Sequence, residues 1–144
     1  EDLIGLRWHE RKTGITPVEL IKDGKHIGVV EIRNPKGRIE LLSQGEKIKF
    51  KMIIKAKGTI ADLQEELSQK EIKELVEKQI EANIKTTFEK GLEQEIDVFN
   101  LKSKLFRSGY SPEEIKTFQL SKDLLEQIQV DFHLESEGLF DGKR

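Results

Sequence analysis

Apolar and polar residues alternate along much of the first half of the chain, as they do in β-strands whose two faces meet different surroundings. The clearest case is EKIKFKMIIKAKG, residues 46–58, where lysines occupy one parity and apolar residues the other. Because a strand turns alternate side chains to opposite faces, this segment predicts a strand with one apolar and one lysine-rich face. Ile53 interrupts the lysine row, which comprises Lys47, Lys49, Lys51, Lys55 and Lys57.

Turn residues divide the rest of this half into shorter strands. Asp23-Gly24 predicts a β-hairpin, because this dipeptide suits a two-residue turn between strands. The composition of residues 33–37, RNPKG, predicts a second turn. The strands predicted around these turns are residues 7–10 near Trp8, 18–22, 26–32 and 38–42.

A four-residue apolar repeat then predicts one long helix. Ser68 suits the N-cap position, and Glu71, three residues on, completes a capping box. Each step of four residues rotates the apolar stripe by about 40° around a 3.6-residue helix. This winding predicts a helix that follows a twisted sheet and is enclosed on more sides toward its C-terminal half. The stripe comprises Ile72, Val76, Ile80, Ile84, Phe88, Leu92 and Ile96, joined by Leu75 and Ala82.

This helix is too long to continue unbroken through the apolar pattern. As far as Phe106 it would measure about 57 Å, against a diameter of about 37 Å for a compact chain of this size. We therefore expect it to bend or break at Gly91 or within residues 97–100. A second capping box, Ser111 with Glu114, precedes a short helix predicted over residues 112–119.

The last alternating segment, EQIQVDFHLESEG, predicts a returning strand with an acidic outer face. If it pairs with the lysine-rich strand, cross-strand Lys–Glu and Lys–Asp pairs would contribute about 0.2–1 kcal/mol each. The element order predicts an α+β fold, in which an antiparallel or mixed β-sheet carries the long helix and a short helix on one face. A length of 144 residues fits a single domain over residues 1–144. The apolar face of the last strand comprises Ile128, Val130, Phe132 and Leu134.

The charge balance bears on the purpose of the lysine row. The chain has 25 Lys and Arg against 27 Asp and Glu, so it lacks the basic excess typical of nucleic-acid-binding proteins. No aromatic residue that could stack on bases lies between the lysines, apart from Phe50 on the opposite parity. We expect a solvated sheet face and no nucleic-acid partner, with contact to an anionic membrane left as an alternative.

The sequence offers no constellation of catalytic or metal-binding residues. It contains no cysteine, nucleotide-binding motif or nucleophile elbow, and no apolar run close to the roughly 20 residues of a membrane span. We expect no enzymatic activity, catalytic residue, metal or cofactor, and no ligand-binding residue is identified. The residues considered were His9, His26 and His133, expected to be structural or on the surface, Glu65, Glu66, Glu74, Glu77 and Glu81, expected on solvated helix faces, and Trp8 and Phe140, expected in the core.

The order of four segments carries a family resemblance. They are GLRWHERKTGITPVELIKDGKHIGVVEI, KIKFKMIIKAKGTIADL, the long charged helix closing on Asp97-Val98-Phe99, and IQVDFHLESEG. Together they resemble the C-terminal region of the Ger(x)C family, the lipoprotein C subunits of nutrient germinant receptors in endospore-forming bacteria. The chain opens on Glu1, without an initiator Met, so we expect a segment of a longer protein whose targeting region lies upstream.

The resemblance implies a non-enzymatic extracytoplasmic domain of a protein lipid-anchored to the outer face of the inner spore membrane. It further implies partnership with the integral-membrane A and B subunits, and a role in nutrient-triggered germination through protein–protein contacts. It brings no ligand-binding residues. The isolated domain is expected to be a soluble monomer, and the alternative function is a free-standing module that binds a peptide or small ligand.

Overall fold

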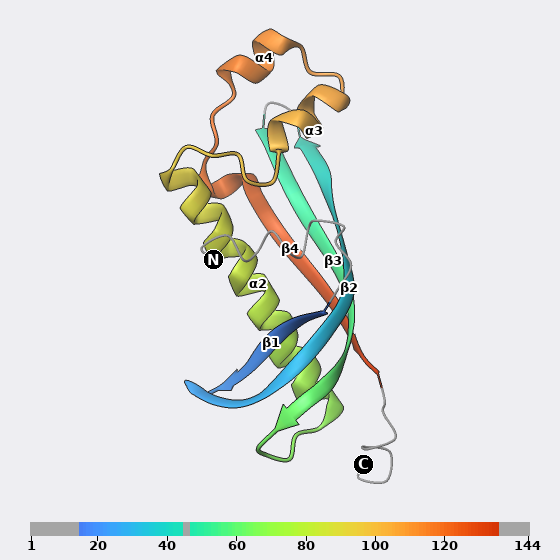
Figure 1. The fold of residues 1–144 in the computed structure, drawn as a ribbon. Helices are drawn as coiled ribbons and strands as arrows, with labels where there is room; N and C mark the ends of the chain where they lie inside the picture. Colours follow the sequence, from blue (N-terminus) through green and yellow to red (C-terminus); the bar gives the residue numbers. More distant parts are fainter. Residues whose placement is uncertain (1–14, 45–46, 136–144) are drawn as a thin grey trace.

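A mixed four-stranded sheet, in the order β1-β2-β3-β4, lies against one long helix, α2 (Figure 1). The β1–β2 and β2–β3 pairs are antiparallel and the β3–β4 pair is parallel, so the predicted α+β class is confirmed. The structure, a computed structural model, describes residues 15–44 and 47–135, so the strand predicted at residues 7–10, Trp8, His9 and Phe140 lie outside it. The elements are β1 (Ile15–Lys22), β2 (Lys25–Gln44), β3 (Lys47–Leu63), α2 (Gln69–Glu93), α3 (Leu101–Arg107), α4 (Pro112–Thr117), the 3-10 helix η1 (Lys122–Leu124) and β4 (Leu125–Leu134).

The predicted hairpin at Asp23-Gly24 is confirmed. Lys22 pairs with Lys25 across the turn. Both central residues have positive φ, 55° at Asp23 and 77° at Gly24, as the tight turns that match the twist of paired strands require.

The turn predicted at residues 33–37 is wrong, because β2 continues through this segment. The β2–β3 register skips at this point, so that Asn34 and Pro35 together oppose Ala56. Asn34 takes a φ of 46°, in the left-handed region that asparagine tolerates well. A bulge also accommodates a proline, which has no N–H to donate to a ladder. The same residues that resemble a turn in sequence therefore bend a strand without ending it.

Strand β3 extends beyond Gly58, where the predicted strand ended, as far as Leu63. A Cβ at Gly58 would lie 2.5 Å from the carbonyl oxygen of Glu31 and 3.1 Å from a ring carbon of Phe132. Glycine is therefore required here for close approach within the sheet rather than to end the strand.

The start of α2 is as predicted. The Ser68 hydroxyl accepts a hydrogen bond from the Glu71 amide at 3.1 Å, and the Glu71 carboxylate accepts one from the Ser68 amide at 3.0 Å. The second of these bonds is the main reason why the pKa of Glu71 is lowered. The two reciprocal bonds satisfy amides that have no partner within the helix.

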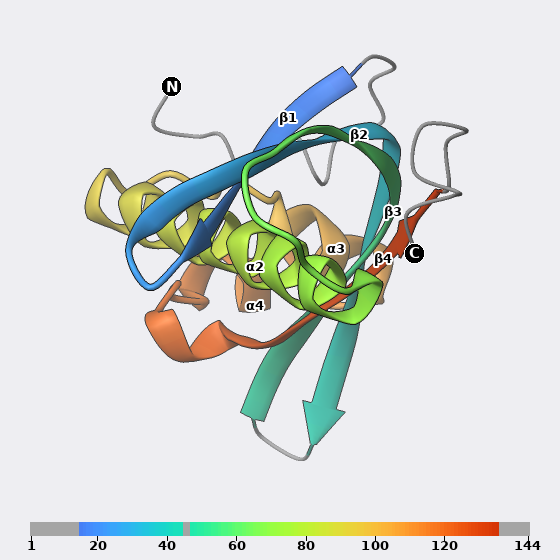
Figure 2. The ribbon, with the colours of Figure 1, turned by 90° about the horizontal axis from the view of Figure 1, so that it is seen from below.

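The sheet curls around α2, as Figure 2 shows from below. Along the first half of the helix one residue in four is buried, whereas Thr87, Phe88 and Gly91 are all buried within little more than one turn. This confirms that the helix is enclosed on more sides toward its C-terminal half. The predicted stripe is wrong at its margins, because Ala82 is exposed and Ile96 lies beyond the helix end with 44% of its surface exposed.

The predicted break in the long helix is confirmed, and the Asp97-Val98-Phe99 motif accounts for it. The Asp97 carboxylate accepts hydrogen bonds from the first two amides of α3, those of Leu101 at 2.8 Å and Lys102 at 2.9 Å. Phe99 is 2% exposed and stacks on Phe88 of α2, with ring centroids 6.2 Å apart. The motif thus starts one helix while holding the chain against the preceding one.

The last two predicted elements are also present. Ser111 and Glu114 form the second capping box at the start of α4, which ends at Thr117, because Phe118 takes an extended backbone conformation. In β4, Phe132 is buried and the other apolar residues on its face are half-buried against the core. The short helices α3 and α4 lie next to each other beyond one end of the sheet (Figure 1).

Replacing the N-cap residue Ser68 tests whether α2 is stabilised at its start. Ser68→Ala removes the acceptor for the Glu71 amide, so we expect a loss of about 0.5–2 kcal/mol in the free energy of unfolding. Chemical denaturation measures it. Gln69→Ala, at the exposed neighbouring position, is the control and should change stability little. An unchanged midpoint for Ser68→Ala would contradict a stabilising role for the cap.

A second substitution tests the turn after α2. Gly→Ala inside a helix ordinarily stabilises by about 1 kcal/mol. At Gly91 the added Cβ would lie 2.7 Å from Val98 Cγ1 and 2.9 Å from the Ile96 carbonyl oxygen. We therefore expect Gly91→Ala to destabilise the protein by about 1–3 kcal/mol through overpacking.

Thermal or chemical denaturation of a double-mutant cycle measures this effect. Val98→Ala removes one of the two clashing groups, so the double variant should lose less stability than the sum of the single variants. A stabilised Gly91→Ala variant would show that the chain after α2 yields easily to the added methyl group.

Candidate functional site

Four lysines of β3 lie on the outer face of the sheet, opposite the face that packs on α2: Lys49, Lys51, Lys55 and Lys57. Lys55 and Lys57 are exposed, whereas Lys49 and Lys51 are half-buried. The Lys49 ammonium donates to the backbone carbonyl of Asp123 at 3.0 Å. Ile53, which interrupts the row, is only 6% exposed although it lies on this face. The row is therefore a sheet surface in which one lysine also fastens the chain before β4.

The predicted pairing of the lysine-rich strand with β4 is confirmed, but the expected cross-strand ion pairs are not formed in the described part of the chain. The register sets Lys55 opposite Asp131, while the neighbouring lysines face Gln127 and His133. The Asp131 carboxylate lies 3.5 Å from the ammonium of Lys73 on α2 instead. The acidic residues of β4 therefore form no ion pair with the lysines of β3 that the structure describes.

The free edge of β4 is held by two side chains of α2. The Glu135 amide donates to the Gly58 carbonyl, which shows that odd-numbered residues of β4 direct their backbone groups toward β3. Phe132 therefore directs its N–H and C=O away from the sheet. Glu77 accepts from the Phe132 amide at 2.9 Å, and Lys73 donates to the Phe132 carbonyl at 3.1 Å. We call Lys73 and Glu77, which also form an ion pair with each other, the edge clamp.

The electrostatics of the edge clamp favour the charged lysine. The hydrogen bond to Glu77 is the main cause that raises the pKa of Lys73, and the charges of Glu77 and Asp131 add to it. Because the pKa is raised on folding, the contribution of the ammonium to stability is present below the ordinary lysine pKa and is lost as the pH rises through the raised value. The Lys73 ammonium of the edge clamp is therefore charged at neutral pH.

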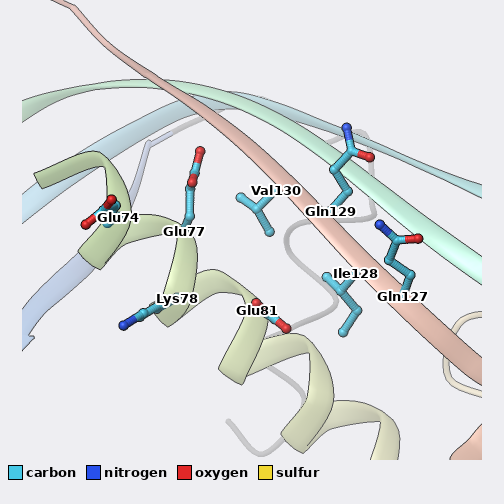
Figure 3. Close-up of a pocket in the computed structure, with 8 residues that line it drawn as sticks. All are labelled: Glu74, Glu77, Lys78, Glu81, Gln127, Ile128, Gln129 and Val130. Carbon is cyan, nitrogen blue, oxygen red and sulfur yellow. The ribbon is translucent and has the colours of Figure 1, made fainter. Parts of the chain in front are cut away.

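Next to the edge clamp, α2 and β4 enclose an open groove of about 530 Å³, which we call the edge groove (Figure 3). Figure 3 shows Glu77 directed toward β4, at one end of the groove. Glu81, one turn further along α2, forms an ion pair with Lys85 at 3.2 Å. The groove is lined by Glu74, Glu77, Lys78 and Glu81 of α2 and by Gln127, Ile128, Gln129 and Val130 of β4.

The role of Glu77 differs from the prediction that this residue lies on a solvated helix face, because its carboxylate is bound at the β4 edge. A signal for it exists in the sequence. Lys73 and Glu77 lie four residues apart, and each directly follows a residue of the buried stripe, Ile72 or Val76. Side chains at such positions flank the apolar face and reach whatever borders it. The sequence does not reveal that a strand edge lies there.

The other residues considered in the sequence do not gather into a site. His26 is exposed beside the hairpin turn and His133 is exposed on β4. Within residues 15–44 and 47–135, no group of three or more His, Asp or Glu side chains is arranged to hold a metal ion. None of the helices in this part of the chain combines the length and apolar composition of a membrane-spanning segment.

A comparison with protein families identifies one family for this chain. Residues 1–138 match the family described as Spore germination B3/GerAC like, C-terminal. The fold is similar to a structure described as the crystal structure of the GerBC protein, with a TM-score of 0.72 and 17% sequence identity. This likeness covers 92% of the present chain and 44% of the GerBC chain, so the present chain spans less than half the length of that protein. A search of curated protein sequences found no match.

The edge clamp can be tested by comparing two glutamates one helical turn apart. Glu77→Ala leaves the Phe132 amide without its acceptor, so we expect a loss of about 1–3 kcal/mol in the free energy of unfolding. Glu81→Ala removes only an exposed ion pair with Lys85 and should cost less than about 1 kcal/mol. Chemical denaturation of both variants decides the point, and equal losses would contradict a distinct role for Glu77.

Proposed function

The chain belongs to the Spore germination B3/GerAC-like, C-terminal family, and from this membership we propose that it is a non-catalytic domain of a germinant receptor C subunit. The observation that carries the proposal is the match over residues 1–138, which takes in every described element. The likeness to GerBC supports the fold alone, and it sets the chain beside less than half of a longer protein.

In this proposal the domain acts through protein–protein contacts. It lies outside the cytoplasm on a protein lipid-anchored to the outer face of the inner spore membrane, where the integral-membrane A and B subunits are its partners. The isolated domain is a monomer and assembles only with these subunits. Two surfaces support a role in contact: the lysine-rich outer face, whose described lysines form no ion pair with β4, and the edge groove beside β4.

The alternative is a free-standing module that binds a peptide or small ligand. The edge groove favours this alternative, because it is concave and lined by both apolar and charged groups. The two proposals differ in the need for other subunits. A receptor domain supports germination only as part of the full-length protein in its complex, whereas a free-standing module needs no other subunit for its function.

The proposal predicts a specific germination defect. In a spore-former that carries the full-length protein, deletion of the segment corresponding to residues 1–138 should abolish the fall in optical density that follows the nutrient. A nutrient-independent trigger should still act, because the remaining germination machinery is intact. Immunoblotting is the control, because it shows whether the truncated protein is still present in the spore. Normal germination with every nutrient the receptor serves would contradict the proposal.

A further inference from the structure

The open part of the β4 edge suggests what the edge groove is built to hold. Backbone groups of a strand in a parallel pair point alternately toward the partner strand and away from it. Since the odd-numbered residues of β4 bond to β3, Ile128 and Val130 direct their N–H and C=O groups to the free edge, as Phe132 does. The edge clamp satisfies Phe132, and no residue of the described chain does the same for Ile128 or Val130.

The surroundings of these two residues suit an extended polypeptide. Ile128 and Val130 line the edge groove, and their side chains are half-buried on the face that packs toward α2. An unpaired strand edge beside a groove is the site at which peptides add as an extra strand, with backbone hydrogen bonds for affinity and side-chain contacts for specificity. At Phe132 the edge clamp already offers a carboxylate and an ammonium in the places where an added strand would offer a carbonyl and an amide.

The charge of the groove selects among such peptides. Its lining has three carboxylates, those of Glu74, Glu77 and Glu81, against one ammonium, that of Lys78. Glu77 is occupied by the edge clamp and Glu81 by Lys85, whereas Glu74 has no ion pair within the described part of the chain. A lysine or arginine on the incoming segment would find a free carboxylate at Glu74.

We propose that the edge of β4 at Ile128 and Val130 binds an extended, basic segment of a partner protein, which adds to the sheet as a fifth strand between β4 and α2. The edge clamp fixes one end of this site, because it occupies the edge at Phe132. This proposal does not rest on the proposed receptor function, because peptide binding can be measured on the 144-residue chain alone.

The probe is a capped peptide of about ten residues in which lysine alternates with valine, a length suited to an ordinary strand. It is titrated into the 144-residue chain at physiological salt and followed by amide NMR. We expect the amide signals of Ile128 and Val130 to move, and their hydrogen exchange to slow about tenfold or more at saturation. A twin with glutamate for lysine should bind at least about tenfold more weakly, because it meets the groove carboxylates. A twin methylated on every backbone nitrogen, which has no backbone N–H left to donate, should not bind.

Matched variants locate the site. Val130→Pro removes the N–H at the free edge without touching the β3 ladder, so it should abolish binding, whereas Val130→Thr keeps the N–H and should bind. Glu74→Lys should reverse the preference in favour of the glutamate twin, and Glu89→Lys, on the same helix outside the groove, should not.

Several outcomes would overturn the proposal. These are equal binding of the lysine and glutamate twins, signal changes away from α2 and β4, or unchanged affinity in a folded Val130→Pro variant. A stable dimer in ultracentrifugation whose Ile128 and Val130 amides are already protected from hydrogen exchange would also overturn it. If Val130→Pro fails to fold, Glu74→Lys and the methylated twin decide the matter. Loss of peptide binding would leave the germination test above unaffected, so the two proposals can fail separately.

Discussion

The packing of α2 into the concave face of the sheet is the contact on which the rest of the structure depends. Four of its residues, one per turn, are fully buried against strands that come from both ends of the sequence. The sheet can follow the helix only because it twists and bends, and the bulge at Asn34 and Pro35 and the close approach at Gly58 allow this. Burial of apolar surface is the dominant favourable term in folding, so the shape of this interface sets the curvature of the sheet.

The same arrangement creates an unusual edge at β4. Because β4 is at the edge of the sheet, only one of its sides is paired, with β3. Open strand edges favour association with other chains. Here α2 runs close enough to the edge for Lys73 and Glu77 to bond to the backbone of Phe132. One residue of the edge is therefore closed by side chains, while the two preceding apolar residues remain open to the edge groove. The same side of α2 therefore carries both the edge clamp, which stabilises β4, and the lining of the edge groove.

The Asp97-Val98-Phe99 motif has a structural explanation that does not involve ligand binding. Asp97 satisfies the first amides of α3, Phe99 stacks on the end of α2, and Val98 lies where a side chain at residue 91 would be. These contacts turn the chain between two helices within a few residues. The motif that contributes to the family resemblance thus consists of residues that fix the fold, and the surfaces proposed for contact lie elsewhere.

The sequence by itself determined the elements whose causes are local. Both capping boxes and the Asp23-Gly24 hairpin depend on neighbouring residues, so their signals lie within a few positions of the chain. The alternation in β3 and β4 likewise revealed which faces are apolar, because side-chain parity is a property of a single strand.

Only the tertiary structure decided the rest, because the remaining features depend on residues distant in sequence. The segment at residues 33–37 became a bulge because β3 holds β2 on both sides of it. Register set Gln127 and His133 opposite lysines, and Asp131 turned to Lys73 on α2. The edge clamp and the edge groove arise where a helix from the middle of the chain meets a strand from its end. No local pattern encodes that meeting, since it depends on how the whole sheet curls.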